Sequence, residues 1–381
     1  MTPRFLHFDL RVPPPRFDST LTDVIIELEH LRRLRLGGTT PSTTFFELKT
    51  IFHLLESLGS ARIEGNITTL AEYVERKIEG QPAENERFKE IANMENAMSF
   101  IDSNVNQGVG ISKAFIRELH KRTVEGLTIE GDRTPGFFRK TNVEITGSDH
   151  LPPESVLVDE YMDNLIDFIN KVQDAKYDLL KIALAHHRFA WIHPFTNGNG
   201  RVVRLLTYAM LIERGFNIGN GRLINPTAVF CSDRSTYYKK LAEADKGTDE
   251  GLLSWAEYVL RGLLTETTKV DKLTQYDYLK KHILMPAIEF SRERQTITEL
   301  ESKILRIAVE KHTFKSSDVE RVMPGKIPAE RSRVLARLRE NELIKPITGG
   351  GRKYTISFSS SLLLRGIIHA LDKEEFISIS Q

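Results

Sequence analysis

The sequence predicts a mainly helical protein with a small mixed helix-and-strand unit at its C-terminal end. Apolar residues recur at helical spacing through most of residues 21–311. Alternating, strand-like patterns are confined to a short stretch near residue 143 and to residues 343–358. We predict four parts: an N-terminal helical region (1–95), a core (96–268), a helical connector (269–295) and a C-terminal unit (296–381).

The composition of the 381-residue chain is that of an ordinary globular protein. Apolar residues make up 40% of it and the formal net charge is +1, so the overall charge does not favour nucleic acid or a membrane. Cys231 is the single cysteine, which excludes an internal disulfide framework and suits a reducing compartment. With no signal peptide or membrane-spanning apolar run in view, we expect a cytoplasmic protein without membrane association.

The N-terminal region is predicted to contain two helices, over residues 21–36 and 42–58, followed by a helical stretch from 70 to 107 that is interrupted near Pro82. Between them, Ser60 and Glu64 are four residues apart and would share one face of a helix. Taken alone, that segment is best interpreted as a helix junction with a surface glutamate.

The core is predicted to contain helices from Ser112 to about Gly126, over 157–172 and over 179–192. Residues 130–155 interrupt this pattern because they lack a helical period and are rich in glycine and proline. Val143 and Ile145 alternate there with polar neighbours, as in a short strand. A long loop of this kind is often functional.

The centre of the core is residues 193–204, which read His-Pro-Phe-Thr-Asn-Gly-Asn-Gly-Arg-Val-Val-Arg. Pro194 disfavours a helical His193, so one helix should end there and the next begin near Arg201. The start of a helix offers free N–H groups and a dipole that favour an anion. Arg201 and Arg204 can reach the same region, and His193 stands at its rim as a candidate base. A glycine pair alone would favour a plain helix–helix turn, but this convergence favours a phosphate site.

This stretch resembles the signature of the Fic family, His-Pro-Phe-x-Asp/Glu-Gly-Asn-Gly-Arg-x-x-Arg. Members are all-helical enzymes, and most transfer AMP from ATP to a protein hydroxyl. The resemblance implies a Fic-type bundle with His193 as the catalytic base. It also implies ATP contacts from Gly198, Asn199, Gly200, Arg201 and Arg204.

One position departs from the family pattern. Asn197 stands where the family carries the acidic residue that holds Mg²⁺. An asparagine carbonyl can ligate Mg²⁺ or Mn²⁺, but it lacks the negative charge that a hard cation prefers. The departure indicates weaker metal binding, or a different donor or metal preference.

Three other segments match parts of Fic proteins. Ser60 to Gly65 matches the inhibitory motif Ser/Thr-x-x-x-Glu-Gly/Asn, which implies that Glu64 pairs with Arg204 and repels the terminal phosphate of ATP. Residues 130–155 match the flap, a β-hairpin that holds the target segment by strand addition. The implied flap residues are Val143, Glu144, Ile145, Thr146, Gly147 and Ser148, and the implied adenine-pocket pair is Tyr237 and Tyr238.

The C-terminal unit is predicted to be a winged helix-turn-helix. Its pattern indicates helices over 299–311, 316–322 and 329–341, then two strands, 343–347 and 353–358, around three glycines. Arginines on the third helix would suit a DNA-reading surface, but acidic neighbours dilute them, and a protein-interaction or dimerisation module is the alternative. The arginines are Arg331, Arg333, Arg337 and Arg339, and the acidic neighbours are Glu330, Glu340 and Glu342.

These observations predict a self-inhibited protein adenylyltransferase that uses ATP and a divalent cation to modify an unidentified target protein or itself. One alternative is an enzyme of the same fold that uses another phosphate-linked donor or removes AMP, which Asn197 favours. Another is a DNA-binding regulator with a nucleotide-sensing core. A homodimer is expected only by analogy with the family.

Overall fold

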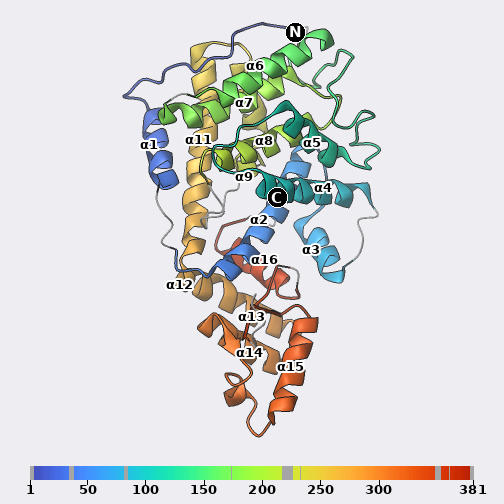
Figure 1. Cartoon of the computed structure of the whole chain (residues 1–381), viewed down its shortest axis with the longest axis vertical. Coiled ribbons are helices and arrows are strands. Elements are labelled where there is room, and N and C mark those ends of the chain that lie inside the picture. Colours follow the sequence, from blue (N-terminus) through green and yellow to red (C-terminus); the bar gives the residue numbers. More distant parts are fainter. Residues whose placement is uncertain are drawn as a thin grey trace. The chain divides into compact units, whose positions relative to one another are not determined.

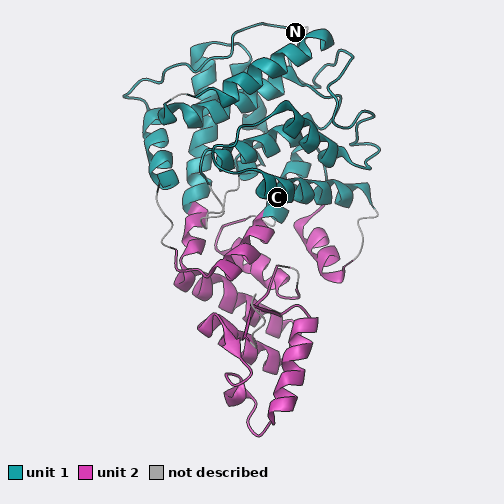
Figure 2. Cartoon of the chain, viewed as in Figure 1, with its two compact units in different colours: residues 1–35, 53–67, 83–268 teal, residues 36–52, 68–82, 269–381 magenta. Residues whose placement is uncertain are grey.

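The computed structural model describes residues 4–33, 38–80, 85–172, 174–216, 226–231, 233–347, 353–359 and 361–377 (Figure 1). The chain divides into two compact units (Figure 2). Unit 1 comprises residues 1–35, 53–67 and 83–268, and unit 2 comprises residues 36–52, 68–82 and 269–381. Residues 269–295, which the sequence assigns to a connector, therefore belong to the same unit as the C-terminal segment. None of the described helices is both long and apolar enough to cross a membrane.

Unit 1 is helical and is built around two buried helices. Residues 178–192 form α7, and nearly every residue of this helix is buried. It packs on α6 and α8, and α8 is buried to the same degree. Because both helices are apolar around most of their circumference, they need neighbours on every side. The helices that contribute to this unit are α1 (Thr20–Arg33), α2 (Ser42–Ile63), α4 (Glu86–Asn104), α5 (Lys113–Val124), α6 (Val158–Asn170), α7 (Asp178–Ile192), α8 (Asn199–Glu213), α9 (Pro226–Cys231), α10 (Arg234–Ala244) and α11 (Asp249–Asp271), of which α2 and α11 contribute to both units.

Helix boundaries in unit 1 follow local signals. The Ser112 side chain accepts a hydrogen bond from Phe115 N at 3.1 Å and caps α5, as the sequence predicts. Helix α2 continues to Ile63, beyond the predicted end at residue 58, so Ser60 lies within the helix. The predicted end of the first helix at residue 36 lies outside the described residues, as does Pro82.

The β-hairpin expected over residues 143–148 is not formed, and that prediction was wrong. Residues 130–155 are all described and contain no strand; His150 makes one isolated parallel bridge, to Arg4. The half-buried positions do alternate with exposed ones at Val143 and Ile145. A turn follows, in which Ser148 N donates to Ile145 O at 3.1 Å. Side-chain alternation was present, but no neighbouring strand supplies the ladder of hydrogen bonds that a hairpin requires.

Unit 2 combines helices with a small antiparallel sheet. The strands β1 (Phe314–Lys315), β2 (Ile344–Pro346) and β3 (Lys353–Ile356) are ordered β1-β3-β2, with Ile344 opposite Ile356. Helix α13 packs on α14 and α16, and α3 packs on α16. The α-helices of this unit are α3 (Leu70–Glu79), α12 (Tyr276–Tyr278), α13 (Met285–Glu293), α14 (Glu299–Lys311), α15 (Pro328–Glu340) and α16 (Leu364–Lys373).

The winged helix-turn-helix assignment stays a prediction. The first and third predicted helices correspond to α14 and α15, but the second is only a 3₁₀ turn, Glu320–Val322. The glycines at 349–351 lie outside the described residues. Two of the four arginines on α15 form ion pairs within the unit, Arg331 with Glu320 at 3.0 Å and Arg337 with Glu301 at 3.2 Å.

Candidate active site

The predicted helix–loop–helix is present around the signature residues. Helix α7 ends at Ile192 and is capped by His193, whose φ of 50° is left-handed. Helix α8 begins at Asn199 after Gly198, whose φ is 77°. The Asn199 side chain closes the loop, because it accepts from Phe195 N and donates to Phe195 O, both at 2.9 Å. Asn199 therefore acts as a clamp on the loop.

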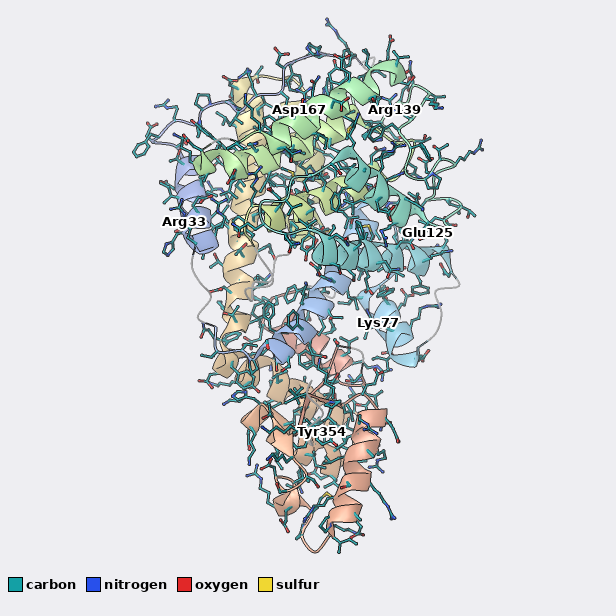
Figure 3. The ribbon with its side chains drawn as sticks, viewed as in Figure 1. Arg33, Lys77, Glu125, Arg139, Asp167 and Tyr354 are labelled. Atoms are coloured by element: carbon teal, nitrogen blue, oxygen red, sulfur yellow. The ribbon has the colours of Figure 1, made fainter. Side chains whose placement is uncertain are left out.

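Arg139, which is labelled in Figure 3, holds the backbone at His193. Its Nε donates to His193 O at 2.9 Å, and its backbone N donates to Pro194 O at 2.9 Å. A left-handed residue other than glycine costs roughly 1 kcal/mol or more, so it persists only where its surroundings fix it. Burial lowers the pKa of Arg139 to about 10, which still leaves its guanidinium charged at neutral pH.

His193 is suited to act as a base. Burial, with a smaller contribution from the nearby Arg139 charge, lowers its pKa to about 4, although a hydrogen bond to the Ala190 backbone and the Glu64 charge oppose the shift. The imidazole is therefore neutral at physiological pH and has a lone pair available for a proton.

Arg204 is held by the segment that resembles the inhibitory motif. Its Nε donates to Ser60 Oγ at 2.8 Å, and its Nη2 donates to Ser60 O at 3.0 Å and to Glu64 Oε1 at 2.7 Å. Burial raises the pKa of the Glu64 carboxyl, but the charge and hydrogen bond of Arg204 outweigh burial and hold the pKa below its ordinary value. The carboxylate lies against the start of α8, since a Cβ on Gly200 would be 2.1 Å from Glu64 Oε1.

Arg201 has a carboxylate partner that the sequence reasoning missed. Its Nη1 lies 2.9 Å from Glu90 Oε1, and both side chains are almost completely buried. The other Glu90 oxygen accepts from Asn66 Nδ2 at 2.7 Å, two residues beyond Glu64. The segment that holds Arg204 is thus also joined, through Glu90, to Arg201. The available signal was that Glu90 lies on the buried, apolar face of a predicted helix, where an unpaired charge is costly.

Glu90→Gln is expected to lower the free energy of unfolding by about 3–5 kcal/mol, because it leaves the Arg201 charge buried without its counter-charge. Urea unfolding would measure the loss. Glu130→Gln is the matched control: Glu130 is 38% exposed and lies 3.6 Å from Arg201, so its loss should cost about 1 kcal/mol or less. Equal losses in the two variants would contradict the assignment of Glu90 as the principal partner.

Asp132 fixes the first half of the signature loop. Its Oδ2 accepts from Thr196 N at 3.2 Å and from Asn197 N at 3.3 Å, and its Oδ1 accepts from Thr134 N at 2.8 Å. The side chain is 1% exposed. This carboxylate joins the 130–155 segment to the loop, and nothing in its sequence position indicated that contact.

His120 supports the same loop from α5. Its ring stacks on Phe195 with centroids 3.7 Å apart, and its Nε2 lies 3.2 Å from Asn197 O. Since Nδ1 accepts from Gly136 N at 2.9 Å, Nε2 carries the proton and donates to Asn197 O. Burial lowers the pKa of His120 to about 4, so this neutral form is kept at physiological pH.

Asn197 turns its side chain towards its own loop. Its Oδ1 accepts from Gly198 N at 2.6 Å. No group of three or more His, Cys, Asp or Glu side chains suited to a metal ion occurs among the described residues. Asn197 Oδ1 also accepts a long hydrogen bond of 3.5 Å from Arg201 Nη2, which must break before the oxygen can ligate a cation. Mg²⁺ bound to a nucleotide needs only one or two protein oxygens, so Asn197 fits as a single, uncharged ligand once Arg201 has moved away.

The predicted tyrosine pair is divided between core and surface. Tyr237 is buried, its hydroxyl lies 2.9 Å from His186 Nε2, and burial raises its pKa. Tyr238 is 44% exposed, and Arg234 lies 5.5 Å from the centre of its ring. Tyr238 is thus accessible to a ligand, and Arg234 is a cation that the sequence reasoning overlooked. The remaining predicted residues converge at the start of α8: His193, Ser60, Glu64, Asn197, Gly198, Asn199, Gly200, Arg201 and Arg204.

The Fic/DOC family model matches residues 110–211, which contain α5 to α8 and the whole signature loop. Residues 110–211 are therefore similar to a Fic domain. Its curated relatives include the protein adenylyltransferase Fic of Drosophila grimshawi, 32% identical over 200 residues, which cover 51% of this chain and 38% of that protein. The same-named protein of Nematostella vectensis is 30% identical over 196 residues, 49% of this chain and 42% of that protein. The chain thus spans less than half the length of these relatives.

Solved Fic structures share the fold. A Fic family protein from Desulfovibrio desulfuricans G20 superposes with a TM-score of 0.55 and 20% identity, over 91% of this chain and 98% of that one. Fic-1 from C. elegans superposes with a TM-score of 0.51 and 21% identity, over 65% of this chain and 71% of that one. The first of these likenesses extends well beyond the matched residues 110–211.

Proposed function

We propose that the protein is a self-inhibited protein adenylyltransferase. The observation that carries this proposal is the occupation of Arg204 by Glu64 at the start of α8, beside a neutral, half-buried His193. A carboxylate there occupies the place that a phosphate of ATP would take. The names of the curated relatives support the same activity.

In the proposed reaction, His193 takes the proton of a Ser, Thr or Tyr hydroxyl of a target protein or of this chain. The oxygen forms a bond to the α-phosphorus of ATP, the bond from that phosphorus to the bridging oxygen breaks, and pyrophosphate leaves. The first-turn N–H groups of α8 hold phosphate oxygens, and Gly198 and Gly200 leave room for them. Arg201 and Arg204 bind the β- and γ-phosphates once Glu64 withdraws. In this proposal the site accelerates the reaction by positioning the hydroxyl and the α-phosphorus and by stabilising the negative charge on the phosphates.

Asn197 would hold Mg²⁺ or Mn²⁺, which would neutralise charge on the donor phosphates. The described flap residues 143–148 form no ladder with another strand, and the hydrogen bond from Ser148 N to Ile145 O lies within their own turn. This supports their proposed role in binding the target by strand addition. Tyr238 and Arg234 would lie beside the nucleotide.

The proposal is tested with ATP labelled on the α- or the γ-phosphate, in the presence of Mg²⁺ or Mn²⁺. Covalent label from α-labelled ATP alone is the expected result. Label from γ-labelled ATP would indicate phosphate transfer and would overturn the proposal. A second candidate, an enzyme of the same fold with another phosphate-linked donor or one that removes AMP, is favoured by the uncharged Asn197.

Asn197→Asp is expected to lower the Mg²⁺ concentration needed for half-maximal transfer by about tenfold, because a carboxylate adds charge to the ligand. The measurement is a Mg²⁺ titration of transfer at fixed ATP. Thr196→Asp is the control, since it adds the same charge to an exposed neighbour. A similar shift in both variants would show a general charge effect and argue against ligation by residue 197.

A further inference from the structure

A groove of about 760 Å³ lies in unit 1 beside the signature loop. Thr196 and Asn197 form one side of it, and Leu127, Phe137 and Phe138 contribute apolar surface. Phe137 is 58% exposed, an unusual state for a phenylalanine beside a candidate active site. The groove therefore combines an aromatic surface with direct access to the loop that precedes α8.

The charge of this groove is positive. Arg133 and Lys140 line it, both are exposed, and neither forms an ion pair with any described residue. Asp132 also lines it, but that carboxylate is 1% exposed and is used by the backbone of the loop. Two unneutralised cations beside an aromatic surface suit a partner that is acidic and partly apolar.

The groove is separate from the residues proposed to bind ATP. Arg201, Arg204 and Tyr238 are absent from the described residues that line it, and Asn197 is the member that the two sites share. The groove also includes Thr141, two residues before the flap position Val143. A chain that lies along the flap would reach both the groove and the loop.

We infer that this groove binds an acidic segment of the target protein, next to the hydroxyl that is modified. The inference rests on the proposed function and adds a substrate class to it. Arg133 and Lys140 pair with Asp or Glu of the target, and an apolar target side chain packs on Phe137. The contacts fix the register of the target, while His193 and the ATP phosphates supply the chemistry.

The test uses the full chain with Glu64→Gly and three acceptor peptides that differ only in the residues around one hydroxyl: glutamates, lysines or alanines. Binding of the fluorescent peptides is measured by anisotropy, and kcat/KM for AMP transfer is measured in parallel. We expect the glutamate peptide to bind at least about fivefold more tightly than the lysine peptide at low salt, with the difference shrinking at about 0.5 M salt.

Charge reversal gives the decisive comparison. Arg133→Glu/Lys140→Glu is expected to reverse the preference in favour of the lysine peptide, with the KM for ATP unchanged. Lys171→Glu/Lys176→Glu is the matched control, because it changes the net charge equally at exposed residues that do not line the groove. This control variant should still bind the glutamate peptide more tightly than the lysine peptide.

The failures of the two ideas are distinguishable. Equal binding of all three peptides overturns the groove assignment. The assignment also fails if the charge-reversal variant raises the KM for ATP but keeps the glutamate preference, because the groove would then bind ATP. The absence of any covalent label, with peptide preference intact in the anisotropy measurement, overturns the proposed transfer and leaves the groove assignment standing.

Discussion

Glu64→Gly is expected to raise AMP transfer at least about 30-fold. The Glu64 carboxylate must leave Arg204 before a phosphate can occupy that position. Truncating one member of a buried, hydrogen-bonded charge pair changes free energies by roughly 2 kcal/mol or more, which corresponds to about 30-fold in rate. The measurement is the rate of covalent label from α-labelled ATP under saturating and limiting ATP, with the larger gain expected at limiting ATP.

The same substitution should destabilise the free protein and make it responsive to ATP. Arg204 is buried, so Glu64→Gly leaves a guanidinium without its carboxylate and lowers the free energy of unfolding by about 3–5 kcal/mol. ATP should restore part of that loss, because it binds only the folded state. Ser60→Ala is the control: it removes one neutral partner of Arg204 and should raise transfer far less. A Glu64→Gly chain that binds ATP but transfers no faster than the wild type would refute the proposed brake.

His193→Ala, made in the Glu64→Gly chain, is expected to reduce transfer by about 10²–10⁴-fold while ATP binding is retained. The reason is that His193 is the proposed acceptor of the hydroxyl proton, whereas the proposed phosphate contacts belong to α8. His187→Ala is the control: His187 lies on α7, the helix that His193 caps, but its imidazole bonds Asp245 at 2.9 Å. Full activity in the His193→Ala chain would exclude His193 as the base.

The pH profile provides an independent check on the same residue. Burial disfavours the charged imidazolium and lowers the pKa of His193 to about 4. The active, neutral form therefore dominates above about pH 5, so transfer by the Glu64→Gly chain should be flat from about pH 6 to 8 and fall on acidification below about pH 5. Because the Glu64 charge raises the His193 pKa, its removal should move this acidic limb to slightly lower pH. A limb near pH 6.5 would indicate a different base.

The sequence predicted the parts of the molecule that depend on local pattern. The helix–loop–helix could be predicted from helical spacing, the serine cap of α5 and the proline after His193. The resemblance to Fic proteins indicated that Glu64 pairs with Arg204. The hairpin failed because strand formation depends on a partner strand, which alternation at Val143 and Ile145 does not supply. Glu90 and Asp132 were missed for a related reason. Each carboxylate contacts a residue that is distant in sequence, and the sequence does not show which residue that is.

The close approach of Glu64 to Gly200 has a consequence for how this chain can evolve. The space left by the missing side chain at Gly200 holds the Glu64 carboxylate, and in the proposed reaction a phosphate of the donor takes the same space. Any side chain introduced at position 200 would therefore damage the inhibited form and the productive form together. Substitution of Gly200 should therefore not yield a permanently active chain, whereas a single substitution of Glu64 should. Natural variation that releases the enzyme should accordingly accumulate in the inhibitory segment and spare the loop.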